Sequence, residues 1–231
     1  GDGRLMQRSR VNAIIAEADA FIRSYGYLLP PFAYWSPDEM RERRPSGVVD
    51  ARLGWDITDY GKGRFEDLGL FLFTVRNGRG ADLAEGRGML YAEKIMISRK
   101  EQLSPMHRHV IKAEDIINRG GGTLALKLFM SAQDGSIDHD APVCVPCDGV
   151  ERRLHAGGVL TLSPGESVTL LPGVWHAFWA EGADVLIGEV SAVNDDETDN
   201  IFAEPIDRFS TIEEDCPPAH LLVSDYRTWL A

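Results

Sequence analysis

Residues 106–114 read Met-His-Arg-His-Val-Ile-Lys-Ala-Glu. His107 and His109 are two residues apart, so a β-strand would place both imidazoles on the same face. Glu114 follows five residues later, which is far enough for the chain to cross a tight bend and return a carboxylate toward the same point. The pattern predicts a strand and a bend that bring three candidate metal ligands together.

A fourth candidate ligand, His176, ends the segment Pro-Gly-Val-Trp-His at residues 172–176. The Pro-Gly pair predicts a turn just before an inward-pointing histidine on a later strand. Three neutral imidazoles and one carboxylate suit a divalent first-row ion such as Mn, Fe, Co, Ni or Zn. Four protein ligands leave two adjacent positions of an octahedral ion open to a substrate with two neighbouring oxygens. A His-x-His pair alone is often merely exposed, so the argument depends on all four side chains.

The rest of the chain has the pattern of a protein built mainly from short strands. Apolar or alternating segments predict strands at 89–97, 123–130, 167–171, 176–180 and 185–190, and the Phe-rich run 68–75 is too short to favour a helix. Clusters of Gly, Pro, Asn and Asp separate these segments at 76–80, 120–122, 133–136, 163–165 and 172–173. This spacing is typical of a β-sandwich or a β-barrel.

Helical signals are confined to the N-terminal part of the chain. Apolar residues at helical spacing between Val11 and Ile22 predict an amphipathic helix, with Ser9 as its cap and Gly26 at its end. Ser36-Pro37-Asp38-Glu39 forms a capping box for a short helix that ends near Arg44. We therefore expect one domain spanning 1–231, with a helical arm at about 9–50, a barrel at about 55–212 and a tail at 213–231.

The amino-acid composition disfavours several classes of protein function. The chain has 24 Lys plus Arg against 36 Asp plus Glu, a net charge of −12, which disfavours nucleic-acid and membrane-surface partners. No apolar run approaches the ~20 residues of a membrane-spanning helix. Three cysteines and an N-terminus without an export signal favour a reduced, cytoplasmic protein without disulfides. The single pair Cys144 and Cys147 is interpreted as two reduced loop cysteines.

Two motifs resemble those of the cupin superfamily. His107-x-His109-x4-Glu114-x6-Gly121 is similar to the first cupin motif, and Gly165 with the Pro-Gly-x-x-His segment at 172–176 resembles the second. The second motif departs from the usual pattern, because Pro and Gly are adjacent and Ala180 stands where Asn is common. The resemblance implies a mainly β fold, a cupin (double-stranded β-helix or jelly-roll) barrel, with N-terminal helices.

Longer stretches at 10–35, 114–122 and 188–200 resemble the cupin-type D-lyxose isomerases. That family implies a manganese-dependent aldose–ketose isomerase, usually a homodimer, that interconverts D-lyxose and D-xylulose and often D-mannose and D-fructose. Co²⁺, Fe²⁺, Ni²⁺ or Zn²⁺ are alternative ions. The ligands implied by the resemblance are His107, His109, Glu114 and His176.

Such a reaction moves a proton between C1 and C2 of an open-chain sugar, and we expect an ene-diol route rather than a hydride shift. The catalytic candidates are Lys94, on the strand before the histidine pair, and Glu204, which could fold over the barrel mouth. The candidate substrate-binding residues are Lys112, Glu189 and Arg208. Each of these five also has an ordinary structural interpretation as a surface charge or a buried ion pair. Asp195, Asp196 and Asp199 are interpreted as a solvated turn.

Two other functions fit the same ligand set. A cupin dioxygenase would use Fe(II) to activate O₂, and it would consume oxygen and have an apolar pocket. A non-catalytic sugar- or metal-binding cupin would bind sugar saturably without turnover. The acidic and lysine residues near the candidate site favour a polyol substrate over an apolar one.

Overall fold

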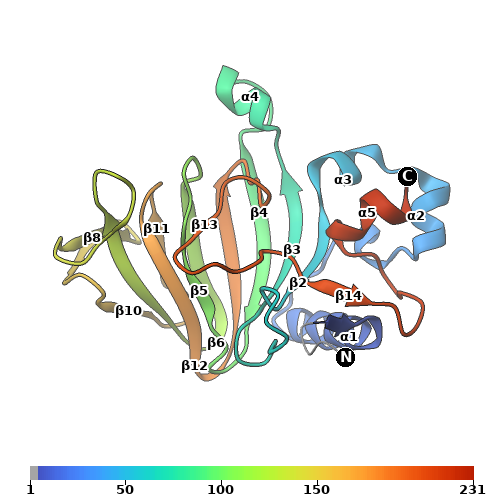
Figure 1. Ribbon diagram of the computed structural model, residues 1–231, viewed down its shortest axis with the longest axis horizontal. Coiled ribbons are helices and arrows are strands. Elements are labelled where there is room, and N and C mark those ends of the chain that lie inside the picture. Colours follow the sequence, from blue (N-terminus) through green and yellow to red (C-terminus); the bar gives the residue numbers. More distant parts are fainter. Residues whose placement is uncertain (1–4) are drawn as a thin grey trace.

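The computed structural model describes residues 5–231, and most of the chain forms one curled antiparallel sheet (Figure 1). Ten strands take part, with β10-β6-β12-β4-β3-β2 as the continuous path and β5, β7, β11 and β13 paired beside it. Their bounds are β2 (Gly54–Thr58), β3 (Leu70–Asn77), β4 (Tyr91–Ser98), β5 (Ser104–Arg108), β6 (Glu114–Ser131), β7 (Ile137–Asp138), β10 (Val159–Leu162), β11 (Ser167–Leu170), β12 (Trp175–Ala192) and β13 (Ile201–Phe202).

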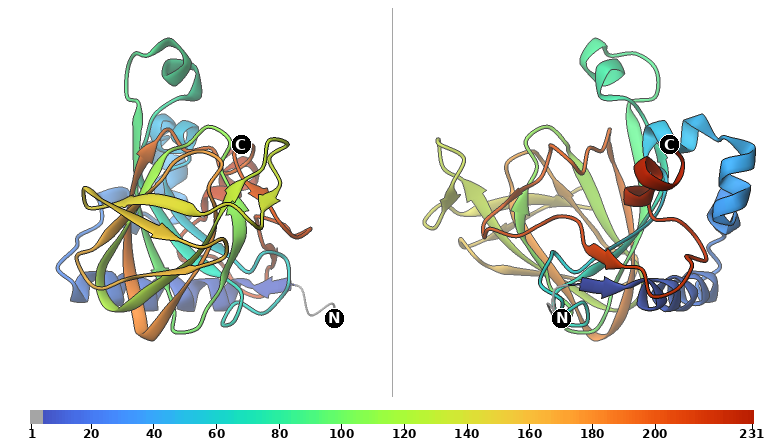
Figure 2. Two further views of the ribbon diagram at one scale, coloured as in Figure 1. Left: turned by 90° about the vertical axis from the view of Figure 1, so that its left-hand side faces the viewer. Right: turned by 45° about the vertical axis from the view of Figure 1, so that its right-hand side comes forward.

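The helices lie on one side of this sheet (Figures 1 and 2). They are α1 (Arg8–Ser24), α2 (Pro37–Arg43), α3 (Ser46–Ala51) and α5 (Tyr226–Trp229), with single 3₁₀ turns at Pro31–Tyr34 and Val223–Asp225. A further helix, α4 (Gly80–Glu85), projects at the tip of the β3–β4 hairpin. Two small sheets complete the fold: β1 (Leu5–Gln7) with β14 (Thr211–Glu213), and β8 (Val143–Cys147) with β9 (Val150–Leu154).

Two apolar cores hold the curled sheet in place. Inward residues of β3, β6, β10 and β12, such as Leu72, Leu126 and Ile187, fill the barrel, while Phe71 and Phe73 pack on α1 outside it. β3 is therefore buried on both faces. This burial explains why its sequence is a continuous apolar run rather than an alternating one.

The predicted strands are present, but one predicted turn is wrong. Gly120-Gly121-Gly122 does not separate two strands, because β6 runs through it from Glu114 to Ser131. Gly120 and Gly121 have φ values of 151° and 103°, and a Cβ on Gly121 would lie 2.0 Å from the Asp184 carbonyl oxygen. The glycines therefore bend a strand that continues. The segments predicted at 176–180 and 185–190 are likewise one strand, β12.

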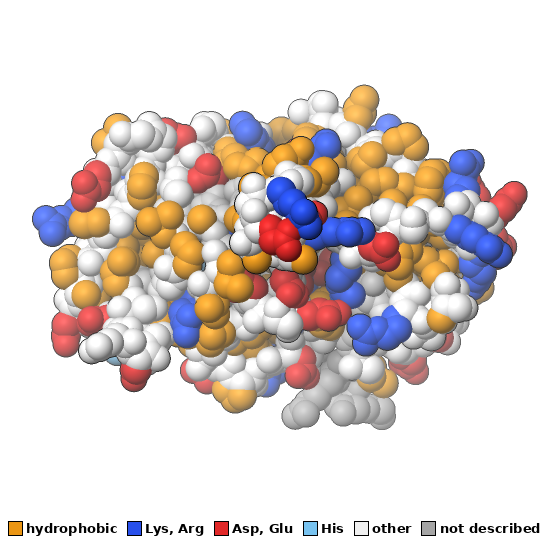
Figure 3. All heavy atoms as spheres, turned by 90° about the horizontal axis from the view of Figure 1, so that it is seen from above, with side chains coloured by type: hydrophobic (Ala, Val, Ile, Leu, Met, Phe, Trp, Pro, Cys, Tyr) orange, Lys and Arg blue, Asp and Glu red, His pale blue; other side chains and the backbone are white. Residues whose placement is uncertain are grey.

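The N-terminal helices largely follow their sequence signals. The apolar stripe of α1 is buried, but the helix begins at Arg8 after Gln7, and Ser9 hydrogen-bonds Asp215 instead of capping. The Ser36 capping box is confirmed at the start of α2. No helix among residues 5–231 is both long and apolar enough to cross a membrane. Seen from above, acidic and basic side chains are interspersed among apolar ones, so the net charge is not gathered on this face (Figure 3).

Candidate active site

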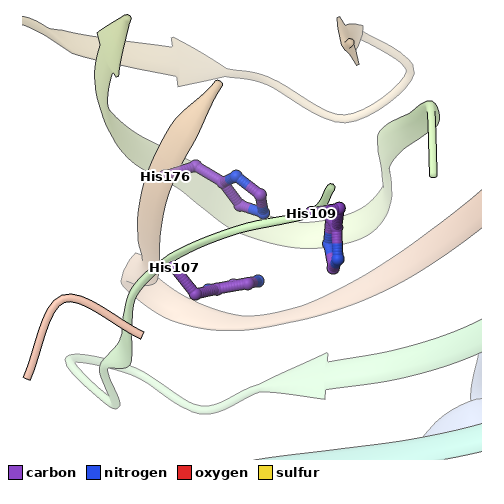
Figure 4. Close-up of side chains that lie close together, drawn as sticks. All are labelled: His107, His109 and His176. Carbon is purple, nitrogen blue, oxygen red and sulfur yellow. The ribbon is translucent and has the colours of Figure 1, made fainter. Parts of the chain in front are cut away.

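Three histidines converge inside the barrel (Figure 4). His107 near the end of β5 is paired in register with His176 near the start of β12, and their ring centroids are 4.1 Å apart. His109 follows β5, and its ring lies 5.2 Å from that of His107 and 5.5 Å from that of His176. Each ring offers one nitrogen, and these three nitrogens all lie within 4.8 Å of one another.

Backbone carbonyls fix the tautomer of all three rings. Nδ1 of His107 lies 2.8 Å from the Pro105 oxygen, that of His176 lies 3.0 Å from the Val174 oxygen, and that of His109 lies 3.0 Å from the Asp199 oxygen. A carbonyl can only accept, so each Nδ1 carries a proton, and in the neutral form of each ring the Nε2 atom presents a lone pair. Burial and the other two rings hold the pKa of His107 well below 6.5, so that ring is neutral at pH 7.

Glu114 begins β6 and brings a carboxylate to the same point. Its Oε1 lies 3.2 Å from Nε2 of His109 and 3.1 Å from Nε2 of His176, and among residues 5–231 this oxygen has no hydrogen-bond donor of good geometry. Burial alone would raise the pKa of this carboxyl, but the adjacent Lys112 ammonium holds it well below 4.5. An anion facing unprotonated nitrogens in a buried site is repulsive without a cation between them. The donor set therefore fits a divalent metal ion.

A chain of alternating charges runs from Glu114 along the inside of the sheet. The Lys112 Nζ lies 3.1 Å from Glu114 Oε2 and 3.3 Å from Glu189 Oε2, and Lys94 Nζ lies 3.9 Å from the same Glu189 atom. Lys94 also lies 3.4 Å from Asp196, which the Arg208 guanidinium contacts at 3.2 Å. Every cation here thus faces at least two carboxylates, because Arg208 also pairs with Asp56 at 2.7 Å.

These contacts perturb the acids in opposite directions. Burial raises the pKa of Glu189 above 4.5, although Lys112 opposes the shift. Burial alone would raise the pKa of Asp196 as well, but the Lys94 and Arg208 cations hold it well below 3.8. Of the two, only Glu189 has its pKa shifted upward, the direction that suits a carboxyl that exchanges a proton.

The structure brings together most of the predicted site residues. One cavity is lined by all four candidate ligands and by Lys94, Lys112, Glu189 and Arg208. Glu204 is exposed and does not line the cavity, although the neighbouring Ala203 N–H hydrogen-bonds the Met106 oxygen. The backbone of this segment therefore reaches the barrel rim, but the Glu204 carboxylate is not brought to the histidines.

The prediction of a solvated turn at 195–199 is wrong for two of its three acids. Asp195 is exposed and caps its own turn, but Asp196 lines the cavity and Asp199 is 5% exposed, buried against the loop after His109. Asn194, which accepts from Lys112 Nζ at 2.8 Å, was also missed. Nothing in the local spacing of these residues reveals that they fold back onto a loop some ninety residues earlier.

Comparison with known proteins places the chain in a family. The sequence model of the D-lyxose isomerase family matches residues 6–226. The D-lyxose/D-mannose isomerase of Escherichia coli O157:H7 is 44% identical over 227 residues, which cover 96% of this chain and 99% of that protein. The protein of the same name from Serratia proteamaculans is 45% identical over 232 residues, covering 98% and 100%.

Solved structures of L-ribose isomerases share the fold. That of Cellulomonas parahominis with L-ribose aligns with a TM-score of 0.53 at 17% identity, over 90% of this chain and 99% of that one. That of Acinetobacter sp. DL28 with L-ribose gives 0.54 at 16% identity, over 90% and 98%. The predicted cupin barrel is thereby confirmed. With a family match along nearly its whole length, the chain belongs to the D-lyxose isomerase family and is an isomerase.

Proposed function

We propose that the protein is a metal-dependent aldose–ketose isomerase that interconverts D-lyxose and D-xylulose, and also D-mannose and D-fructose. The aldoses are those named for its relatives from Escherichia coli and Serratia proteamaculans. The observation that carries the metal dependence is the buried Glu114 Oε1 atom, which faces the Nε2 atoms of His109 and His176 and has no hydrogen-bond donor of good geometry among the described residues. His107, His109, Glu114 and His176 would hold the ion, for which we propose Mn²⁺, with Co²⁺, Fe²⁺, Ni²⁺ and Zn²⁺ as alternatives.

When bound, the divalent ion supplies electrophilic stabilisation of the negative charge that develops on the sugar oxygens. The rest of the cavity favours an uncharged polyol. Lys94, Lys112 and Arg208 are each neutralised by two carboxylates, so no cation is left over for a phosphate group. Arg208 lines the cavity, and its buried Nη1 atom has no hydrogen-bond partner among the described residues, so we assign it a sugar hydroxyl.

Proton transfer between C1 and C2 needs a carboxyl that can exist in both protonation states. Glu189 meets this need, because it is buried in the cavity wall with a raised pKa. It would take the proton from C2 of the aldose as carboxylate and return it to C1 as carboxylic acid, while the O2 hydroxyl proton passes to O1, which makes the intermediate an ene-diol. Lys94 lies opposite Glu189 in register and would hold its orientation, and Lys112 would bind a sugar oxygen beside it.

An assay of metal-loaded protein with D-lyxose, D-mannose and a panel of ketoses tests this proposal, with and without oxygen. We expect aldose-to-ketose conversion that is independent of O₂, and uptake of solvent deuterium at C1 or C2 when the reaction runs in D₂O. Oxygen consumption would favour the dioxygenase instead, and saturable sugar binding without turnover would favour a non-catalytic role. Transfer of label within the sugar without any deuterium uptake would contradict the ene-diol route.

We also propose that the active form is a cytoplasmic homodimer. The three cysteines are free, in keeping with a reduced compartment. Light scattering on the purified protein gives the mass in solution, and a value near one or four chains would contradict the dimer.

A further inference from the structure

The first half of the loop between two of the candidate ligands is poorly fixed by its own side chains. Residues 110–113 connect His109 to Glu114, and within this loop Val110 is 49% exposed and Ile111 is 65% exposed. Backbone hydrogen bonds hold the two ends of the loop, from Gly173 N to the His109 oxygen at 2.9 Å and from Ala192 N to the Ala113 oxygen at 3.0 Å. Neither contact restrains the middle.

One carboxylate from a distant segment holds the middle of this loop. Asp199 Oδ1 accepts hydrogen bonds from the backbone N–H groups of Val110 at 2.9 Å and Ile111 at 2.8 Å, and its Oδ2 accepts from that of Lys112 at 3.0 Å. Three successive N–H groups directed at one buried carboxylate form a concave anion-binding site made by the backbone. The conformation of the loop therefore depends on this side chain.

The backbone of Asp199 acts on the adjacent imidazole. Its carbonyl oxygen accepts from His109 Nδ1 at 3.0 Å. His107 and His176 instead use carbonyls two residues earlier in their own chain segments, those of Pro105 and Val174. Only His109, among the three, takes its orientation from a part of the chain ninety residues away.

We propose that Asp199 is a positioning residue for the metal site. Its carboxylate fixes the loop that sets the distance between His109 and Glu114, and its carbonyl fixes the tautomer and direction of the His109 ring. Asp199 contacts neither the ion nor the sugar, so it acts through His109 and Lys112. The inference rests on the proposed function, because it presumes that the histidines and Glu114 hold a metal ion.

Asp199→Asn tests the proposal with little change in size. The carboxamide can still accept from two N–H groups, but its NH₂ then faces the third donor. We expect the affinity of metal-stripped protein for Co²⁺ to fall about 10–100-fold, the usual effect of losing a partner of a metal ligand. Calorimetric titration gives the dissociation constant, and the visible absorption spectrum of bound Co²⁺ should change. Asp199→Glu restores a carboxylate and should recover part of the affinity.

Asp138→Asn is the matched control. Asp138 Oδ1 also accepts two backbone N–H groups, from Asp140 and Ala141 at 2.9 Å each, but Asp138 ends β7 and does not line the cavity. The Asp138→Asn variant should leave Co²⁺ binding unchanged. A merely structural role for Asp199 would lower the melting temperature without altering Co²⁺ affinity well below that temperature.

Unchanged Co²⁺ affinity in folded Asp199→Asn would overturn the inference while leaving the proposed function intact. Failure of the wild-type protein to bind any divalent ion would overturn both. If Asp199→Asn does not fold, the wild-type protein loaded with diamagnetic Zn²⁺ provides the second measurement. Long-range ¹H–¹⁵N correlations should place a slowly exchanging proton on Nδ1 of His109, and a proton on Nε2 instead would overturn the assignment.

Discussion

The two buried glutamates of the cavity differ in what surrounds them. The Lys112 ammonium beside Glu114 holds the pKa of that carboxyl low, whereas burial raises the pKa of Glu189. Carboxyl groups whose environments separate their pKa values can take different roles in one reaction. We therefore assign metal binding to Glu114 and proton transfer to Glu189.

Glu189→Gln should separate these roles. We expect kcat for D-lyxose to fall by ~10²–10⁴-fold, because a carboxamide cannot exchange the proton. Metal content should stay near that of the wild-type protein, since Glu189 is not a proposed ligand. Glu181→Gln, on the same strand but outside the cavity, is the control and should retain activity. Loss of metal together with activity in Glu189→Gln would contradict the assignment.

The raised pKa of Glu189 also predicts the pH profile. The carboxylate is the active form of the base, so kcat/KM should fall as the pH drops through a value above 4.5. The pKa of His107 lies well below 6.5, so this candidate ligand is protonated only at low pH. Assays at saturating metal should therefore report the protonation of Glu189 rather than loss of the ion. Rates measured from pH 4 to 9 check this expectation. A profile that stays flat down to pH 4.5 would count against Glu189 as the base.

Sequence spacing predicted the convergence of the candidate ligands better than it predicted their surroundings. His107 lies near the end of β5, His109 directly follows the strand and a tight bend returns Glu114, so short spacing along the chain is enough to group them. Glu204 and Asp199 lie in the irregular chain around β13, where no period applies. The side chains of this segment are placed by tertiary contacts, so Glu204 remained a candidate and Asp199 was missed.

At the scale of elements, the long strand β12 carries a candidate site residue near each of its ends. His176 and Glu189 are thirteen positions apart, so an unbroken two-residue period would put them on opposite faces. The pairing of β12 with β6 shifts register between Glu181 and Val185 and again between Leu186 and Ile187. These irregularities allow His176 and Glu189 to line one cavity. Bulges of this kind leave little trace in composition, which is why the side on which Glu189 lies could not be predicted.

Gly121→Ala tests the bend in β6 that lies opposite this irregular part of β12. A Cβ at residue 121 would meet the Asp184 carbonyl oxygen at 2.0 Å, and φ is +103°, so backbone must move. We expect the free energy of unfolding to fall by about 2 kcal/mol or more. Gly47→Ala is the control, because the space around it is open and its φ is ordinary, and it should be neutral or slightly stabilising. Urea denaturation of both variants measures the difference.

At the scale of the whole molecule, a buried arginine joins the two ends of the described chain. Arg8, at the start of α1, is fully buried and hydrogen-bonds both Glu214 and Asp225. β1 pairs with β14 beside this contact. The segment after the barrel is thereby fixed against the first helix.

Arg8→Ala should destabilise the fold without changing the chemistry. It leaves Asp225, which is 8% exposed, without its cation, and we expect a loss of about 3 kcal/mol in unfolding free energy. Arg10→Ala removes a more exposed pair with Glu66 and should cost less than about 1 kcal/mol. Urea denaturation compares the two variants, and equal losses would contradict the importance of burial. kcat should be unchanged in both at a temperature where they are folded.

The dependence of His109 on Asp199 has a consequence for biosynthesis. The carbonyl that aims this ring is polymerised ninety residues after the ring itself. During synthesis, His107 and His109 are therefore made long before the Asp199 carbonyl that orients the His109 ring. If the site holds an ion as proposed, we expect its capture to require a chain that extends beyond Asp199.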